Sequence, residues 1–507
     1  MLLDRSFFKK TGFYLLLFCY FLGHTQSQDP AIKSDFYQNP IFAGDYPDPS
    51  IIRDGEDYYI VHSSFNYFPG LLIWTSRDLI NWKPVIHALT KNVGAVWAPD
   101  LVKYNNKFYI YFPANNTNYV VWSEKISGPW SDPIDLKIGN IDPGHVADAD
   151  GNRFLYFSNG SYSPLTKDGL SINGEAKQVY DGWPIPEDWS IECFCMEGPK
   201  ITKHGDYYYL TTAEGGTAGP ATSHMVISAR SKSPLGPWEN SPHNPIIKTN
   251  SSTEKWWSKG HASLIDDAKG NWWMVFHGYE NGYYNMGRQT LLQPVEWTKD
   301  GWFKSPENIQ TEALLKKPAG QLIKSNFSLS DSFSKTTLSP QWQFFNDFEP
   351  ERFNLTSNGI QIKAKGKSIG ESAPLLCTPS DHSYTAEVEV DIEGNTTAGL
   401  ILFYDTRLYT GIAADKENIL AILRSWQFPT KKGINKKHLF LRLDKKEQLV
   451  NMYYSTDHTI WHKIENSAEV TSFNHNVLSG FMSLKLGLSA VGDGQVTFRN
   501  FVYIPKK

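Results

Sequence analysis

The sequence predicts an all-β protein made of a five-bladed β-propeller followed by a jelly-roll β-sandwich. Runs of aromatic and β-branched residues recur through the first 310 positions, where helical periodicity is scarce. Beyond residue 330 the strand-like alternation continues with frequent turns, but the repeat of the first part is gone. A chain of 507 residues is also too long for one ordinary domain.

Five runs mark the predicted propeller, and each follows a turn rich in Gly, Asn, Asp or Lys. Their first aromatic residues are spaced by 50, 46, 53 and 65 positions and are Tyr58, Phe108, Phe154, Tyr207 and Trp272. Five units of about four short strands predict five blades over residues 30–315. Radial repetition leaves only short, protected strand edges, which suits an exported all-β protein.

One position of this repeat falls at the innermost strand of each predicted blade. It lies 10 to 12 residues before the aromatic residue and is occupied by Asp48, Ala98, Asp142, Glu197 and His261. Because innermost strands line the central channel of a propeller, these side chains are predicted to converge on one axis. Three carboxylates and one imidazole would then share a pocket.

Crowded carboxylates repel one another, so such a cluster costs stability unless a function uses it. Crowding raises one pKa and leaves another carboxylate ionised, which separates an acid from a base, and cleavage of a glycosidic bond needs that pair. A single Asp before Pro is ordinarily a turn or cap residue, but three acids at one repeat position favour a glycosidase. His261 alone stays ambiguous between a metal ligand, a substrate-orienting group and a plain channel histidine.

Motifs spread over residues 30–315 resemble glycoside hydrolase family 43, whose members share a five-bladed propeller. In family order they include "YPDPSII", "VWAPDLVKY", "IDPGHVADADG", "MEGPKI", "TAEGGT", "KGHASL" and "GRQT". The resemblance implies that Asp48 is the general base and Glu197 the general acid of an inverting reaction. It implies that Asp142 raises the pKa of Glu197 and orients it.

The same resemblance extends to residues around the trio. Arg288, in "GRQT", corresponds to an arginine that holds Asp142 and a sugar hydroxyl. Phe65, Phe68 and Trp97 are expected to wall the pocket of the terminal sugar, although blade packing is an alternative role for each ring.

In some family members the histidine equivalent to His261 is tied to a calcium ion through water. No dense cluster of oxygen ligands accompanies His261 in this sequence. No cofactor is therefore expected to be required, and calcium in the channel near His261 is left open.

The stretch 314–331 shifts in composition and is predicted to connect the propeller to a sandwich over residues 330–507. The opening of this second part resembles the sandwich appended to many family 43 xylosidases and arabinofuranosidases. In those relatives one loop of the sandwich closes part of the active-site mouth. "RSWQFPT" (424–430) is a candidate for that loop, with a place in the core as the alternative.

Residues 1–27 are predicted to be an export signal. A basic start at Arg5, Lys9 and Lys10 precedes a short apolar core, "GFYLLLFCYFLG" (12–23), and Ser27 offers a small residue for cleavage. This core is too short to span a bilayer comfortably, so no membrane anchor is expected. A periplasmic location is favoured, with secretion as the alternative.

The remaining composition excludes several classes of function. The net charge is −4 and basic residues are scattered, which argues against binding nucleic acid or an anionic membrane. Cys193, Cys195 and Cys377 are expected to be small buried apolar residues rather than a disulfide scaffold or a metal site. On a regular strand, Cys193 and Cys195 would share a face with Glu197 and narrow the pocket rim.

The sequence thus predicts an exo-acting glycosidase that releases terminal α-L-arabinofuranose from hemicellulose oligosaccharides, such as those of arabinoxylan or xyloglucan. A β-xylosidase is the near alternative, and an endo-acting arabinanase is a further one. A non-catalytic, lectin-like propeller is the rival from another class. The oligomeric state is left open.

Overall fold

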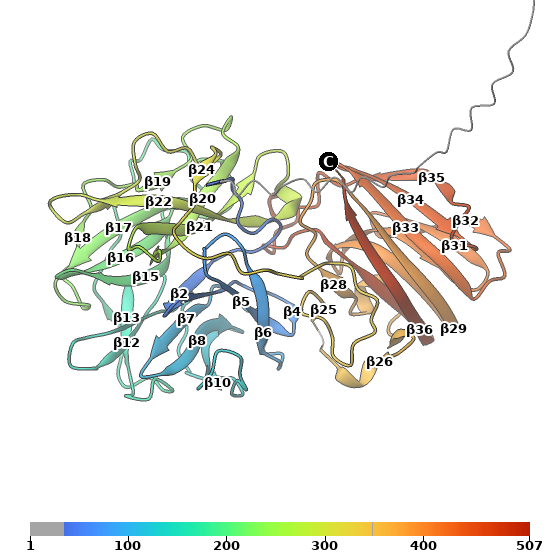
Figure 1. Ribbon diagram of the computed structural model, residues 1–507, viewed down its shortest axis with the longest axis horizontal. Coiled ribbons are helices and arrows are strands. Elements are labelled where there is room, and N and C mark those ends of the chain that lie inside the picture. Colours follow the sequence, from blue (N-terminus) through green and yellow to red (C-terminus); the bar gives the residue numbers. More distant parts are fainter. Residues whose placement is uncertain (1–34, 347, 507) are drawn as a thin grey trace, which may run out of the picture. The chain divides into compact units, whose positions relative to one another are not determined.

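The computed structural model describes residues 35–346 and 348–506 (Figure 1). The predicted export signal, residues 1–27, lies outside the described residues. The first part of the chain forms five successive antiparallel sheets, which are the blades of a propeller. Together with the concanavalin A-like sandwich that follows, they confirm the predicted fold class.

Each blade is built from strands that follow one another in the chain, and each strand pairs with the next. Blade I contains β2 (Ser50–Asp54), β3 (Asp57–Val61), β5 (Gly70–Ser76) and β6 (Lys83–Leu89). Blade II contains β7 (Asp100–Tyr104), β8 (Lys107–Ala114), β9 (Thr117–Ser123) and β10 (Ile134–Asp135). Blade III contains β11 (Gly144–Ala147), β12 (Arg153–Tyr156), β13 (Ser161–Leu165) and β14 (Lys177–Gln178).

The last two blades are larger. Blade IV contains β15 (Met196–His204), β16 (Tyr207–Glu214), β17 (Met225–Ser231), β18 (Glu239–Asn240) and β19 (Ile247–Lys248). Blade V contains β20 (Trp256–Asp266), β21 (Trp272–Glu280), β22 (Arg288–Trp297) and β23 (Phe303–Lys304). The aromatic runs of the sequence are the second strands of the blades, so their spacing measures the blade repeat.

Separate hydrophobic cores join each blade to the next. Residues of blades I and II share one core, and the same holds for blades II and III, III and IV, and IV and V. A further core joins blade V to blade I through Trp273 and Tyr58. The amide of Asn39 reinforces this junction by bonding to Leu292 and Thr311, and β1 (Phe36–Tyr37) pairs with β24 (Leu315–Lys316). The ring is therefore closed.

The sandwich is organised around two long strands, β29 (Tyr384–Asp405) and β36 (Lys485–Pro505), which pair along most of their length. The second half of β29 continues into β30 (Leu408–Ala414), β31 (Asn418–Leu423) and β32 (Trp426–Lys432). Its first half pairs with β33 (His438–Lys446), followed by β34 (Leu449–Ser455) and β35 (His462–Glu469). Between the halves, Gly394 pairs with Gly494, and both have positive φ angles that favour glycine.

Shorter elements complete the sandwich. They are β25 (Gln343–Phe345), β26 (Phe353–Thr356), β27 (Gly359–Lys363), β28 (Leu375–Cys377) and a single helical turn, α1 (His475–Leu478). The 3-10 turns are η1 (Tyr284–Met286), η2 (Pro350–Arg352) and η3 (Ile369–Glu371). Cys377 is buried in the sandwich core, as predicted.

The propeller and the sandwich belong to one compact unit, residues 36–507. Strand β4 (Tyr67–Phe68), from the loop before β5, pairs with β25 of the sandwich. Phe65 and Tyr67 are part of the same hydrophobic core as the sandwich residues Phe344 and Phe345. The second domain is thus packed against the loop that follows β3.

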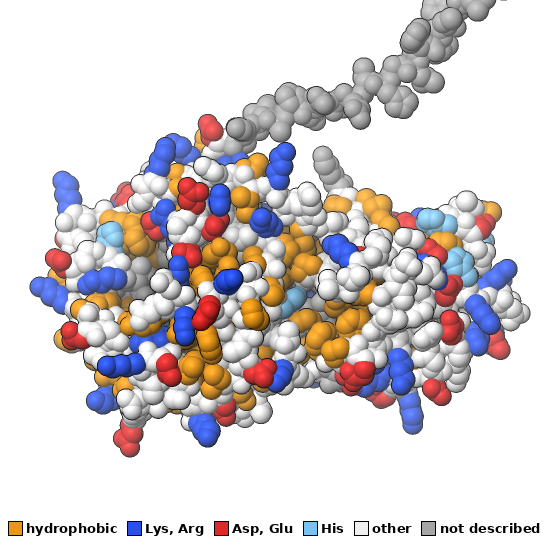
Figure 2. Space-filling model, turned by 60° about the horizontal axis from the view of Figure 1, so that its bottom comes forward, with side chains coloured by type: hydrophobic (Ala, Val, Ile, Leu, Met, Phe, Trp, Pro, Cys, Tyr) orange, Lys and Arg blue, Asp and Glu red, His pale blue; other side chains and the backbone are white. Residues whose placement is uncertain are grey.

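Surface charge agrees with the composition. On the face in Figure 2, basic and acidic side chains are interspersed and neither forms a continuous patch. Over residues 35–346 and 348–506, no helix is long and apolar enough to cross a membrane.

Candidate active site

The three predicted carboxylates line one pocket of about 110 Å³. Asp48 and Asp142 each lie two residues before an innermost strand, β2 and β11, with φ angles of 56° and 57°. This left-handed conformation is uncommon outside glycine, though Asp tolerates it better than most residues. Glu197 is the second residue of β15, and a β-bulge follows it. Bulges next to a site re-aim side chains, here toward the channel.

Asp48 is held as a buried anion. Its carboxylate accepts hydrogen bonds from Arg288 Nη1 at 2.8 Å and from Ser63 Oγ at 2.5 Å. Burial raises the pKa of Asp48, but the charge of the Arg288 guanidinium opposes burial, and this pKa lies well below its usual range. An ionised carboxylate fixed in this way is suited to accept a proton from water.

Arg288 differs from its expected place. The resemblance implied a bond to Asp142, whereas the guanidinium bonds to Asp48 and lies against the rings of Phe65 and Phe481, at 5.7 and 5.3 Å from their centroids. Burial and the charge of Asp48 raise the pKa of Asp142 to about 7, and the charge of Arg288 offsets only part of this rise. The reason is geometric: Arg288 begins β22 in blade V, which adjoins blade I and its Asp48.

Asp142 and Glu197 are a second pair of interacting groups, and the charge of Asp142 acts on the proton of Glu197. The backbone N–H of Gly198 donates to Asp142 Oδ2 at 3.0 Å, which ties the loop of blade III to the strand that carries Glu197. Burial and the charges of Asp142 and Asp48 raise the pKa of Glu197 well above its usual value. Glu197 therefore keeps a proton that it can donate, while Asp48 does not.

Three neutral imidazoles surround the carboxylates. His277 Nδ1 accepts the backbone N–H of Asp48 at 3.1 Å, and its Nε2 faces Thr217 Oγ1 at 3.2 Å. His261 Nδ1 lies 3.4 Å from Asp48, and His224 Nε2 lies 3.5 Å from Glu197. Burial lowers the pKa of all three rings. They orient the carboxylates without adding positive charge.

The walls of the pocket are mostly apolar, and two predicted rings are among them. Phe65 and Trp97 line the pocket together with Ile141 and Phe481. Phe68 does not take its predicted place: it is 1% exposed and packs in the core between blades I and II. Its backbone lies in β4, which pairs with the sandwich, and this pairing directs the ring away from the channel.

Phe481 reaches the pocket from the sandwich. It lies just after α1, where its ring stacks on His475 at 3.9 Å and its backbone N–H bonds to His475 Nδ1. Trp97 meets it edge-on, with ring centroids 6.3 Å apart. A sandwich loop therefore closes part of the mouth, but not the candidate segment 424–430, whose Trp426 lies on β32 and is 73% exposed.

Comparison with known proteins agrees with this geometry. The model for glycosyl hydrolases family 43 matches residues 37–303, and that for the beta xylosidase C-terminal concanavalin A-like domain matches residues 330–503. The chain belongs to glycosyl hydrolase family 43.

Relatives in the family carry more than one activity name. A non-reducing end alpha-L-arabinofuranosidase of Bacteroides ovatus, BoGH43B, is 29% identical over 90% of this chain and 92% of its own. A xylan 1,3-beta-xylosidase of a Vibrio species is also 29% identical, over 84% of this chain and 90% of its own. The crystal structure of BlXynB from Bacillus licheniformis superposes with a TM-score of 0.84 at 28% identity, covering 93% of this chain and all of that one.

The channel also contains a buried cation, the ammonium group of Lys200. Lys200 Nζ lies 2.8 Å from Asp100 Oδ1 and 2.9 Å from the carbonyl oxygen of Pro99. Asp100 in turn accepts from Ser50 Oγ and from the backbone N–H of His145. Since Lys200 belongs to blade IV and these partners to blades I, II and III, one ammonium group connects four blades.

The described residues around His261 form no dense set of calcium ligands. Calcium needs six to eight oxygen ligands, and within the described parts of the chain no group of three or more His, Cys, Asp or Glu side chains could hold a metal. Lys200 already neutralises Asp100, and its charge contributes to the lowered pKa of His261.

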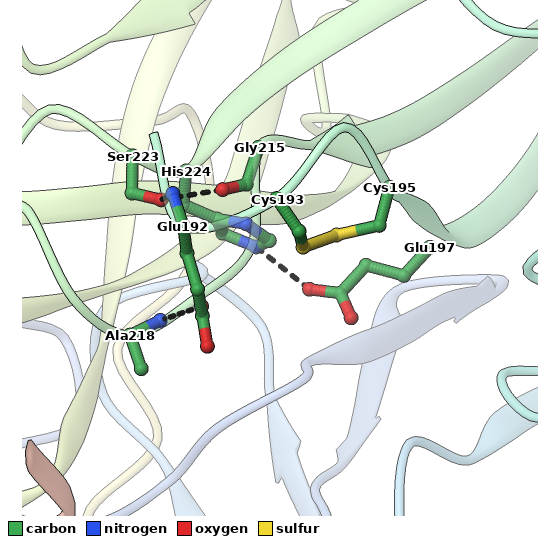
Figure 3. The surroundings of a disulfide bond; sticks show 8 residues. All are labelled: Glu192, Cys193, Cys195, Glu197, Gly215, Ala218, Ser223 and His224. Carbon is green, nitrogen blue, oxygen red and sulfur yellow. Dashed lines mark hydrogen bonds and ion pairs between the residues drawn. A yellow bond between two sulfur atoms is a disulfide. The ribbon is translucent and has the colours of Figure 1, made fainter. Parts of the chain in front are cut away.

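The cysteines before Glu197 also depart from expectation. Cys193 and Cys195 are joined by a disulfide and are only partly buried (Figure 3). Because β15 begins at Met196, both precede the strand, and the period-two argument does not apply to them. Two thiols separated by one residue can meet only where the chain turns, which an extended strand does not allow.

Three site residues that were not predicted from the sequence could have been found from their positions in the repeats. Ser63 and His277 are the polar residues that end the runs "DYYIVHS" and "NWWMVFH", and Thr217 ends "TAEGGT". A polar residue at the channel end of a buried strand points to the site. Phe481 had no such signal, because its place depends on how the sandwich meets the propeller.

Proposed function

We propose that this family 43 glycosidase is an exo-acting, inverting α-L-arabinofuranosidase that trims terminal arabinofuranose from hemicellulose oligosaccharides. The observation that carries the proposal is the opposite electrostatic treatment of two carboxylates in one pocket: the pKa of Asp48 is lowered and that of Glu197 is raised. Glycoside hydrolysis needs this pairing of a base and an acid.

In the proposed reaction Asp48 removes a proton from a water molecule as the water oxygen attacks the anomeric carbon. Glu197 donates its proton to the glycosidic oxygen as the bond to the leaving sugar breaks. Asp142 keeps the proton on Glu197 through its negative charge, and it fixes the backbone at Gly198. Arg288 and Ser63 hold Asp48 in place for the attack.

The size of the pocket supports action on a chain end. A volume of about 110 Å³, bounded by Phe65, Trp97 and Phe481, suits one sugar ring rather than a chain running through. A pentose, with one carbon fewer than a hexose, suits a pocket this small. The similarity to the arabinofuranosidase BoGH43B supports arabinofuranose as the terminal sugar. The similarity to the Vibrio xylosidase makes terminal β-xylose the second candidate.

Two nitrophenyl glycosides separate the candidates. We expect faster hydrolysis of the arabinofuranoside than of the xyloside, and the reverse order would make the protein a β-xylosidase. Hydrolysis of neither substrate would contradict both readings. Sugar release from arabinoxylan and xyloglucan oligosaccharides, identified by chromatography, then defines the natural polymer.

Catalysis is distinguished from sugar binding alone by two conservative variants. Asp48→Asn and Glu197→Gln should each lower kcat by about a thousandfold, because each removes one proton-transfer group. Binding of the released pentose, measured by calorimetry, should persist. Asp457→Asn, an exposed change on the sandwich, is the matched control. A non-catalytic propeller would bind sugar without turnover in every variant.

We further propose that the enzyme is exported to the periplasm and needs no metal. The basic start and short apolar core of residues 1–27 support export, and the Lys200 ammonium in the channel supports metal independence. Fractionation of the producing cells tests export. Activity after EDTA treatment, with and without added calcium, tests the second point, and a loss that calcium restores would contradict it.

A further inference from the structure

A short segment before Glu197 forms a rim beside the catalytic pocket. The backbone N–H groups of Glu192 and Cys193 both donate to the carbonyl oxygen of Gly215, and Gly215 N–H donates to the carbonyl oxygen of Cys195. Two residues beyond Gly215, Thr217 lines the pocket. The segment 192–195, which we call the rim segment, is thus fixed to the turn that contributes to the site.

Side-chain contacts fix the rim segment further. The carboxylate of Glu192 accepts the backbone N–H of Ala218 at 2.7 Å (Figure 3). A Cβ at Gly216, where φ is 82°, would lie 2.5 Å from Glu192 Oε2 and 3.0 Å from Cys193 Sγ, so only glycine allows this approach. The charge of Glu192 contributes to the raised pKa of Glu197, which places the rim segment close to the acid.

The disulfide of the rim segment presents an aromatic ring to solvent. Phe194 lies between Cys193 and Cys195 and is 68% exposed. The disulfide joins the two neighbours of Phe194, and both neighbours form backbone hydrogen bonds with Gly215. Together these bonds hold the main chain of Phe194 in one place. A ring held on a fixed main chain offers a flat apolar face on which a ligand can stack.

Phe194 and Cys195 form one side of a second cavity, of about 590 Å³, which also includes Met196. Trp183 supplies another aromatic wall. The polar lining consists of carboxylates, from Asp181, Glu187 and Glu214, with no Lys or Arg among the lining residues. Glu214 is 2% exposed and accepts the backbone N–H of Trp183 at 2.8 Å, so the wall is built around a buried acid.

Aromatic faces with hydrogen-bond acceptors between them match the chemistry of a neutral sugar, which has apolar ring faces and hydroxyl donors. The leaving sugar must lie on the side of the general acid, because Glu197 protonates the oxygen that departs with it. The rim segment adjoins Glu197 in the chain, and Met196 and Glu197 are consecutive residues at the start of β15.

We propose that the cavity beside Phe194 binds the leaving-group part of a neutral oligosaccharide, with a sugar ring stacked on Phe194 and the Cys193–Cys195 disulfide holding that ring in place. This inference rests on the proposed glycosidase function. The exposed carboxylates of Asp181 and Glu187 repel leaving groups that carry uronic acids. Phe194 is then a specificity-determining residue for the sugar next to the scissile bond.

The test compares two substrates that release the same pentose, a neutral trisaccharide and the methyl glycoside. In Phe194→Ala the ratio of kcat/KM for the trisaccharide to that for the methyl glycoside should fall about tenfold, the loss of one stacking contact. Phe194→Tyr should restore most of the ratio, and Phe428→Ala, at an exposed ring on β32, should leave it unchanged. Reduction of the disulfide should lower the ratio in the wild type but not further in Phe194→Ala.

Two results would overturn this inference while the proposed function stands: an unchanged ratio in Phe194→Ala, or an equal loss on both substrates, which marks a structural effect. Faster cleavage of a uronic-acid-bearing trisaccharide than of the neutral one would overturn the charge argument. Wild-type protein that hydrolyses neither the methyl nor the nitrophenyl glycosides would instead contradict the proposed function itself.

Discussion

Asp48 has a left-handed backbone conformation and two partners, the neutral imidazole of His277 and the charged guanidinium of Arg288. Its left-handed φ brings the backbone N–H to the ring nitrogen of His277, while the carboxylate faces Arg288. A residue in this conformation is strained unless its surroundings determine it, and here both ends are fixed. Asp142 and His261 have nearly the same φ, so three of the five repeat positions share the left-handed backbone conformation.

The protonation state of Glu197 should determine how activity depends on pH. Glu197 acts in its protonated form, so kcat/KM should fall as the pH rises through its raised pKa. In Asp142→Asn the negative charge that raises this pKa is removed, and the alkaline limb of the kcat/KM profile should move to lower pH. Asp48, with its lowered pKa, stays ionised at all pH values near this limb.

The measurement is a profile of kcat/KM against pH for the wild type and Asp142→Asn on one nitrophenyl glycoside. Circular dichroism at each pH controls for unfolding. An alkaline limb that stays in place, or moves to higher pH, would show that Asp142 does not hold the proton on Glu197.

Individual strands are interrupted where they meet the channel. Register shifts occur in β15 after Glu197 and in β20 on both sides of Gly260, the second of them spanning His261. In a regular strand Glu197 and Lys200 would point to opposite faces, since they are three residues apart. One extra residue in the bulge brings both toward the channel, so the acid and the internal ammonium come from one strand.

Loss of the Lys200 ammonium should destabilise the whole propeller. In Lys200→Met the buried carboxylate of Asp100 loses its counter-charge, and the free energy of unfolding should fall by about 3–5 kcal/mol. Urea unfolding followed by tryptophan fluorescence measures this change. Lys200→Met with Asp100→Asn should recover part of the loss because no buried charge remains, whereas a single-variant loss under about 1 kcal/mol would contradict the argument.

At the scale of the molecule, two folded parts complete one pocket. The ring alone supplies the carboxylates, while the sandwich supplies Phe481 and fixes the loop that contains Phe65. Further bonds cross between the parts, among them Asn476 with Gly219 and His382 with Glu280. The sandwich is therefore part of the catalytic unit.

Truncation of the Phe481 ring tests this dependence without unfolding either part. In Phe481→Ala, kcat/KM on the nitrophenyl glycoside should fall about tenfold, because one wall of the sugar pocket is lost. Phe428→Ala, on the same sandwich but outside the pocket, is the control. If both variants keep wild-type activity, the sandwich contributes no contact to the sugar.

The sequence by itself determined the blade repeat, the closed ring of five blades and the convergence of Asp48, Asp142 and Glu197. These features follow from a pattern that each blade repeats locally, so a periodic reading recovers them. Only the tertiary structure decided that Phe68 belongs to the core, that Arg288 pairs with Asp48, that Cys193 and Cys195 are bonded, and that Phe481 completes the pocket. Each of these depends on a bulge, a turn or a meeting of two domains, where neighbours in space are distant in the chain and no local period records them.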